Sequence, residues 1–285
     1  MFGFLNINKP KGITSHKAIA FLRKILDIKQ IGHAGTLDPI ASGVLPIAIG
    51  KASKLIDYLP TDKNYIVGMY LGFESDTFDT DGIVRKTDCK KITKEKIETE
   101  LEKFKGTIQQ IPPAFSAVHY KGKRLYELAR KGEIPDDIPS REITIYKNEL
   151  IEFDYEKQII KLNISCSKGT YIRSVVNDLG KELKTGAVMY ELTRTFSGGM
   201  NIKNSIILTK ETKKEDILKT LIKPQDILQL KTINVSEEEF KHVLNGNKYK
   251  NNTNINGNVL LIKDNNVVAL ADVENGIIQP KKVLL

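Results

Sequence analysis

The stretch between residues 143 and 183 has two strand patterns followed at once by a helix pattern. Strands are expected at about 143–153 and 159–166, after which Gly169-Thr170 turns the chain. An apolar stripe at helical spacing follows, formed by Ile172, Val175, Val176, Leu179 and Leu183. Any fold for this chain must therefore join strands to a helix here, and the join places Tyr171 and Arg173 at an element junction.

The first fifty residues predict a strand, a helix and a glycine-rich loop. The strand begins at Leu5 and is stopped by Pro10 and Gly12. Thr14-Ser15 can N-cap a helix with an apolar stripe through Leu26. Residues 31–50 are rich in glycine and small residues, so we expect a loop that lets a ligand approach the backbone closely.

The rest of the chain alternates strands, helices and turns. Residues 65–72 predict a strand, and 79–82 a turn before a returning strand at 83–85. Thr93 can cap a helix that ends by Gly106. Residues 107–147 mix aromatic and basic side chains. From 232 to 285, short apolar runs separated by three Asn-Gly dipeptides predict hairpins and a small β-rich domain.

The composition favours an acidic macromolecular partner such as nucleic acid. The 44 Lys and Arg residues outnumber the 35 Asp and Glu residues, for a formal charge of +9. No apolar run approaches the roughly 20 residues of a spanning helix, and the start lacks a secretory signal, so we expect a cytoplasmic protein. The two cysteines form no C-x-x-C and the four histidines are scattered, so no metal site is expected.

Asp38 has two interpretations when read locally. It precedes Pro39, which favours an extended conformation, and neighbouring glycines leave room for a bulky ligand beside the backbone. These features suit a fixed, presented carboxylate. The alternative is that Asp38-Pro39 simply begins a turn.

Other candidate residues have similar alternatives. Asp79 belongs to a cluster that resembles a calcium loop, but the EF-hand register would put Asp88 at the last ligand position, so a turn is the simpler interpretation. Arg173 can keep a buried carboxylate ionised or be a surface arginine at a helix start. His33 and Tyr65 can be catalytic or structural, and the local sequence does not decide.

Six motifs stand out when the chain is read as a whole. They are Asn8–Gly12, Gly32–Pro39, Asp62–Tyr65, Asp76–Gly82, Ile111–Ala117 and Cys166–Arg173. Taken together, in order and spacing, these motifs resemble the TruB family of bacterial tRNA pseudouridine synthases. The likeness extends over nearly the whole chain and is weakest after about residue 230.

The resemblance implies an α+β fold in which helices flank a mixed, mainly antiparallel extended sheet. It implies a catalytic domain over 1–231, with an RNA-clamping insertion at 107–147. Residues 232–285 would form a PUA-like RNA-binding domain. The hairpin dipeptides of the C-terminal part agree with this expectation.

The resemblance also implies the reaction and its residues. The uridine at position 55 of the tRNA T-loop would be detached at its glycosidic nitrogen, turned and rejoined through carbon, without a cofactor. Asp38 would be the nucleophile, Tyr65 would stack on the flipped base as a candidate general base, and Arg173 would pair with Asp38. The expected substrate and RNA contacts are His33, Leu192, Tyr171, Asp79, Lys54, Lys121 and Arg124.

Two other functions remain open at this point. The first is a related RNA-guided enzyme that works within a multiprotein particle, but no terminal extensions for such assembly are evident. The second is a catalytically silent tRNA-binding module, against which the catalytic motifs argue. We expect a monomer that modifies tRNA without an obligatory protein partner.

Overall fold

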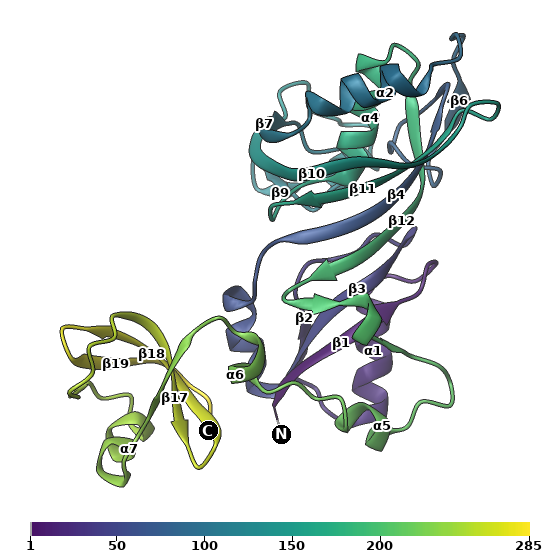
Figure 1. Ribbon diagram of the computed structural model, residues 1–285. Helices are drawn as coiled ribbons and strands as arrows, with labels where there is room; N and C mark the ends of the chain where they lie inside the picture. The colour runs from purple at the N-terminus through teal and green to yellow at the C-terminus, as the bar shows by residue number, and fades with distance from the viewer. Residues whose placement is uncertain (1) are drawn as a thin grey trace. The chain divides into compact units, whose positions relative to one another are not determined.

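The computed structural model describes residues 2–285, which form two compact units (Figure 1). Unit 1 contains the described residues up to Asp38, Val44–Pro60 and Ser197–Leu285. Unit 2 contains Pro39–Gly43 and Thr61–Phe196. The chain therefore passes from unit 1 into unit 2 directly after Asp38 and returns to unit 1 at Val44.

The N-terminal part of unit 1 is a small sheet with the order β14-β1-β3, and β2 pairs antiparallel with β3. Thr14 caps α1, because its side chain accepts a hydrogen bond from the Lys17 N–H. The elements are β1 Gly3–Lys9, α1 Ser15–Leu26, β2 Ile31–His33, β3 Ala41–Ile49, the 3-10 helices η1 Gly50–Tyr58 and η2 Ile202–Asn204, β13 Met200–Asn201, β14 Ile206–Ile207, α5 Lys214–Leu218 and α6 Pro224–Ile227.

The C-terminal part of unit 1 is a five-stranded sheet in the order β15-β17-β18-β19-β16. It has a core of its own with α7, formed by residues such as Val243, Val259 and Ile278. The elements are β15 Lys231–Asn234, α7 Glu237–Leu244, β16 Tyr249–Lys250, β17 Gly257–Lys263, β18 Asn266–Glu274 and β19 Ile277–Val283.

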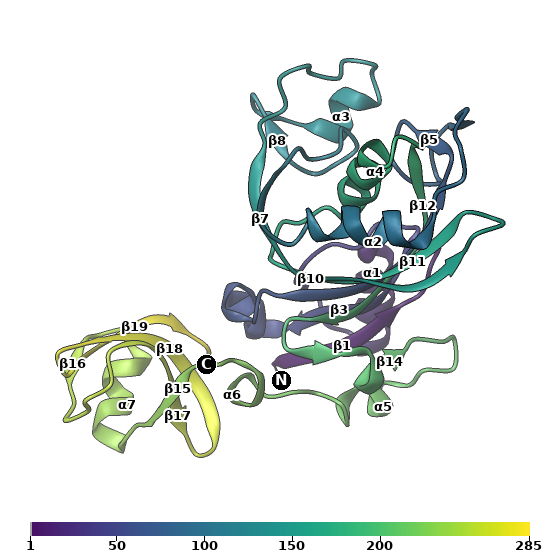
Figure 2. The same cartoon turned by 45° about the horizontal axis from the view of Figure 1, so that its top comes forward.

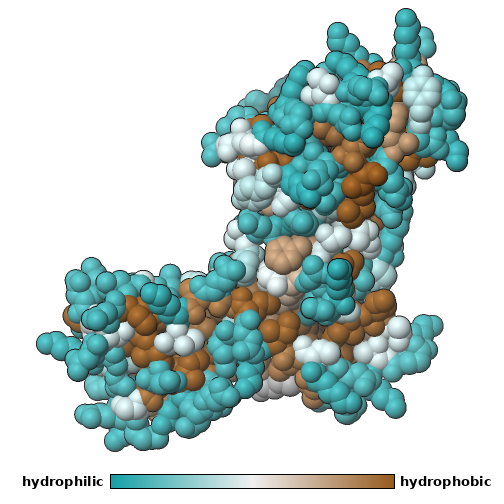
Figure 3. All heavy atoms as spheres, viewed as in Figure 1, coloured by the Kyte–Doolittle hydropathy of each residue, from teal (hydrophilic) through white to brown (hydrophobic). Residues whose placement is uncertain are grey.

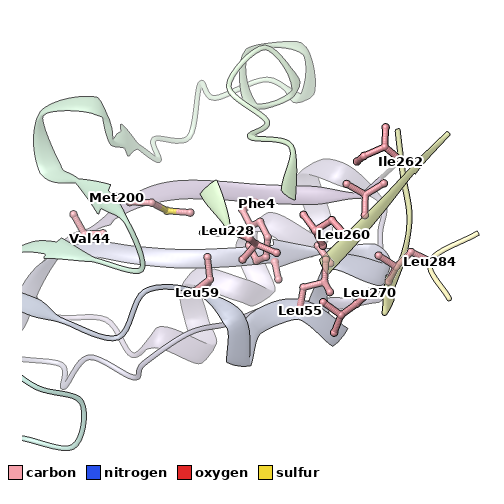
Figure 4. Packing of buried hydrophobic residues seen from close by; sticks show 13 residues of the cluster. Phe4, Val44, Leu55, Leu59, Met200, Leu228, Leu260, Ile262, Leu270 and Leu284 are labelled. Atoms are coloured by element: carbon pink, nitrogen blue, oxygen red, sulfur yellow. The ribbon is translucent and has the colours of Figure 1, made fainter. Parts of the chain in front are cut away.

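A second core joins the two parts of unit 1. Phe4 of β1 and Leu55 of η1 belong to the same buried cluster as Leu260, Leu270 and Leu284 of the C-terminal part. Figure 4 shows these side chains gathered between the two parts. On the face drawn in Figure 3, apolar surface also gathers where the C-terminal sheet meets α6. Apolar burial therefore holds the C-terminal sheet against the N-terminal part.

Unit 2 is built on the strand order β12-β4-β11-β10-β7, and the first residues of β3 pair parallel with β12. The pairs β4–β11, β11–β10 and β10–β7 are antiparallel. Helix α2 contacts β10 and α4, and α4 contacts β4 (Figure 1). The elements are β4 Lys63–Leu71, β5 Phe73–Ser75, β6 Val84–Lys86, α2 Lys94–Glu102, β7 Gly106–Gln110, β8 His119–Tyr120, β9 Lys123–Arg124, α3 Leu125–Ala129, β10 Arg141–Asp154, β11 Ile159–Cys166, α4 Ile172–Glu182 and β12 Ala187–Ser197.

Three local predictions were wrong. Residues 31–50 are mostly strand, because the apolar run of β3 is buried and only 34–40 form a loop. Strand β4 pairs with β11, so the hairpin after it is formed by β5 and β6. Asn245-Gly246 ends α7 instead of turning a hairpin. By contrast, Asn275-Gly276 does join two paired strands, β18 and β19.

Candidate active site

Asp38 is half-buried in the loop between β2 and β3. Its neighbours Leu37 and Ile40 are both buried, with 3% of each exposed. Pro39 follows directly, and the φ of proline is fixed by its ring. The carboxylate thus sits on a short loop anchored on both sides by buried apolar residues.

Ser15 anchors this loop from α1. Its hydroxyl accepts a hydrogen bond from the Leu37 N–H at 2.9 Å and donates one to the Leu37 carbonyl at 3.1 Å. The local sequence indicated Ser15 only as a possible helix cap, a role that Thr14 performs. No local pattern shows a contact between residues 22 positions apart, so sequence reasoning missed it.

The other predicted site residues of unit 1 are His33 and Lys54. The ring of His33, at the end of β2, meets the ring of His16 edge-on, with centroids 5.8 Å apart. Lys54 donates from its Nζ to the Val283 carbonyl at 3.2 Å, and Lys282 donates to the Lys54 carbonyl at 2.6 Å. Lys54 therefore helps to join η1 to β19, and its contact with RNA stays a prediction.

Arg173 connects three segments of unit 2. Its Nη1 donates to the Thr77 carbonyl at 3.0 Å, and its Nη2 donates to the Phe115 carbonyl at 2.9 Å. Its Nε lies 3.6 Å from Oδ2 of Asp79, and the side chains of this ion pair are each only 6% exposed. The arginine is therefore a fixed, buried cation and not a surface residue at a helix start. Its predicted pairing with Asp38 stays a prediction.

Asp79 is 4% exposed, and its carboxylate accepts hydrogen bonds from neighbouring groups. Besides Arg173, the Thr77 hydroxyl donates to Asp79 Oδ1 at 2.5 Å and the Asp81 N–H at 3.1 Å. Burial raises the pKa of Asp79, and these donors and the arginine oppose that rise. The turn interpretation therefore accounts for Asp79, and contact with the bases of the RNA loop stays a prediction.

Tyr171 is fixed by Gln110, at the end of β7. The Gln110 amide group donates to the Tyr171 carbonyl at 3.0 Å and accepts from the Tyr171 N–H at 2.8 Å. Tyr171 directly precedes α4, so this buried glutamine sets the position of the turn that carries Arg173. A third hydrogen bond connects α4 to the residue after β7: the Ser174 hydroxyl donates to the Ile111 carbonyl at 2.9 Å. Gln110 was not among the predicted residues.

Tyr65 and Leu192 are buried in the strands of unit 2. Tyr65 lies on β4 opposite Ile164 of β11 and is 5% exposed. Leu192 lies on β12 opposite Ala41, the first residue of β3, and is 6% exposed. Both side chains lie almost wholly within the protein, and their predicted contacts with a flipped base stay predictions.

Lys121 and Arg124 belong to a small hairpin, β8–β9, within the segment that leaves β7 (Figure 2). Lys121 and Gly122 form its turn and both have positive φ, 46° and 84°. The Lys121 Nζ lies 4.7 Å from the centroid of the Tyr120 ring and 3.8 Å from Oδ2 of Asp137. Both basic side chains are exposed, so the tip presents cations next to an aromatic ring.

Other features of the described residues do not add to this site. Among residues 2–285, no group of three or more His, Cys, Asp and Glu side chains is arranged to hold a metal ion. No helix within this range has the length and apolar character needed to cross a membrane. Unit 1 contains a cavity of about 700 Å³, lined by Phe2, Lys51 and Lys223 among others, but none of the predicted site residues line it.

Comparison with known proteins identifies the family. Residues 23–172 match the family model described as TruB family pseudouridylate synthase (N terminal domain). The tRNA pseudouridine synthase B of Caldanaerobacter subterraneus subsp. tengcongensis is 40% identical, over 99% of this chain and 98% of that protein. The protein of the same name from Lactobacillus johnsonii is 41% identical, again over 99% and 98%.

Solved structures agree with the fold predicted from the motifs. A chain from the crystal structure of a Cbf5-Nop10-Gar1 complex superposes with a TM-score of 0.73 and 25% identity, covering 99% of this chain and 85% of that one. The predicted fold, a mixed sheet with flanking helices and a separate C-terminal sheet, is confirmed. The chain belongs to the TruB family of pseudouridylate synthases.

Proposed function

We propose that this protein is a tRNA pseudouridine(55) synthase that isomerises a uridine of the T-loop. The observation that carries the proposal is the relatedness to tRNA pseudouridine synthase B proteins over 98–99% of both chains. Asp38, Tyr65 and Asp79 lie within the segment that matches the family model, and Arg173 follows it directly.

Asp38 acts as the nucleophile in this proposal. The bond between the ribose and N1 of the uracil breaks, the base turns, and a bond from the ribose to C5 replaces it. The proton on C5 is lost to a base and N1 gains a proton, so the product is an isomer of the substrate. A carboxylate suits the task because it can bond to carbon and leave again. The half-buried, anchored loop supports this role.

The remaining site residues hold the carboxylate and the base. Arg173 keeps Asp38 ionised, and its own fixed geometry supports such a role. Tyr65 stacks on the flipped uracil and is the candidate general base for proton removal. Leu192 packs against the uracil ring. Flipping the uracil out of the RNA loop costs on the order of a few kcal/mol and leaves the loop remodelled. His33 holds this remodelled loop.

RNA binding is proposed for two further parts of the chain. Residues 107–147 clamp the T-arm, and the exposed cations beside Tyr120 on the hairpin tip support this role. Residues 232–285 form a PUA-like RNA-binding domain, whose separate core supports treating 1–231 as the catalytic domain. With several phosphates contacted, binding should weaken steeply as salt rises.

The protein is proposed to work as a monomer without an obligatory protein partner. The test is to incubate the purified protein alone with an isolated T-arm stem-loop and to map pseudouridine. We expect conversion of the single T-loop uridine. A strict requirement for a guide RNA or partner proteins would favour the RNA-guided alternative instead.

Asp38→Asn tests the assignment of the nucleophile. We expect the variant to form no pseudouridine while tRNA binding, measured by filter retention, persists. Asp57→Asn is the matched control, because Asp57 is an exposed carboxylate of η1 in the same unit and should stay active. An active Asp38→Asn protein would contradict the mechanism.

A further inference from the structure

Ser15 satisfies both backbone polar groups of a single residue in a distant loop. The residue is 1% exposed, and its hydroxyl both accepts from the Leu37 N–H and donates to the Leu37 carbonyl. Leu37 is itself buried, so water cannot easily replace these bonds. The hydroxyl therefore acts as a two-point clamp on the backbone of Leu37.

The hydroxyl of Ser15 is not needed by its own helix. Thr14 is the N-cap of α1, with extended backbone angles of −76° and 156° and a side chain that accepts from the Lys17 N–H at 3.1 Å. The contact that explains a buried serine here is therefore the one with the loop.

The clamp on Leu37 determines how Asp38 is presented. The Leu37 carbonyl lies in the same planar peptide unit as the nitrogen and Cα of Asp38, so fixing that carbonyl fixes the plane from which the Asp38 side chain departs. On the other side, Pro39 restricts Asp38 to extended backbone angles. Both peptide planes that flank Asp38 are thus constrained, one by proline and one by Ser15.

We infer that Ser15 is a positioning residue of the reaction: its hydroxyl aims the Asp38 carboxylate without touching the substrate. This inference rests on the proposed function of Asp38. Misplacing a reacting group by about 1 Å can cost on the order of 100-fold in rate. Loss of the clamp therefore lowers the rate of the chemical step more than it lowers affinity for RNA.

The test compares Ser15→Ala with Thr14→Ala in the full-length protein. Thr14→Ala removes the cap of the same helix but leaves the contact with Leu37, so it controls for any weakening of α1. For Ser15→Ala we expect a single-turnover rate about 10- to 100-fold lower on a T-arm stem-loop, with the Kd for tRNA changed less than about threefold. Thr14→Ala should stay within about twofold of the wild-type rate.

A second measurement reads the clamp without using activity. Hydrogen exchange followed by mass spectrometry should show faster exchange of the loop 34–38 in Ser15→Ala and not in Thr14→Ala, with both proteins folded. Unchanged exchange in that loop, or equal turnover rates for the two variants, would overturn the inference. An inactive wild-type protein would instead contradict the proposed function, and the exchange result would then still show whether the clamp exists.

Discussion

Replacing Gln110 by alanine removes the two hydrogen bonds that fix the turn before α4. The side chain is 3% exposed and makes hydrogen bonds of 3.0 Å and 2.8 Å to the carbonyl and N–H of Tyr171. A buried polar group left without a partner costs about 1–3 kcal/mol. Because Tyr171 is only half-buried, water can partly replace the lost bonds, so we expect the lower end, about 2–3 kcal/mol for both groups together.

Urea unfolding and thermal melting measure this loss. In domains of about 150–250 residues, a size close to that of unit 2, a loss of about 2–3 kcal/mol lowers the Tm by roughly 4–12 °C. Gln110→Met separates hydrogen bonding from packing, because methionine keeps most of the side-chain volume but cannot replace the amide. We expect it to lose nearly as much stability as Gln110→Ala.

Gln109→Ala is the matched control. Gln109 precedes Gln110 in β7 and is exposed, and its side chain accepts a hydrogen bond from the Ser140 hydroxyl at 3.1 Å. It should lose no more than about 0.5 kcal/mol. If Gln110→Ala and Gln109→Ala unfolded at the same urea concentration, the Gln110 amide would not stabilise the turn before α4. Turnover by folded Gln110→Ala should also fall, since the same turn positions Arg173.

Three further predictions concern other groups. Burial raises the pKa of Cys166 to about 11, so about one Cys166 thiol in a thousand is ionised at pH 8. A thiol reagent should therefore modify the half-buried Cys89 before Cys166. The variant Cys89→Ser should lose the fast phase of the modification time course. The raised pKa of Asp79 contributes stability that is fully present below about pH 4 and is lost as pH rises through the folded-state pKa. Urea midpoints should therefore show the advantage of wild type over Asp79→Asn shrinking with rising pH, and a growing advantage would contradict the sign. Leu270→Ala in the shared core of unit 1 should cost about 2–5 kcal/mol in urea unfolding, against almost nothing for exposed Leu244→Ala.

Local sequence patterns predicted the strands and helices in which buried residues recur at a regular spacing. In β11, buried and partly buried residues alternate along the whole strand, so periodicity alone indicated it. The helix after Thr93 begins where its cap was predicted. In β3, by contrast, almost every residue is buried, whichever face of the sheet it lies on. Gly43 within the strand and Gly32, Gly35 and Gly50 near it obscured the strand pattern. Gly43 is present because a side chain there would meet the backbone of Arg194, with the nearest atom 2.2 Å away.

The amino-acid sequence could identify the family motifs, and with them the expected roles of Asp38, Tyr65 and Arg173. It could do so because each motif is a short run whose residue types and order can be read without a fold. Only packing brings together the distant groups that hold Arg173, Tyr171 and the loop before Asp38. The Thr77 and Phe115 carbonyls and Asp79 contact Arg173, Gln110 binds Tyr171, and Ser15 binds Leu37. These contacts join positions 22 to 96 residues apart. Such pairs become neighbours only when strands and helices pack, so no local pattern encodes them.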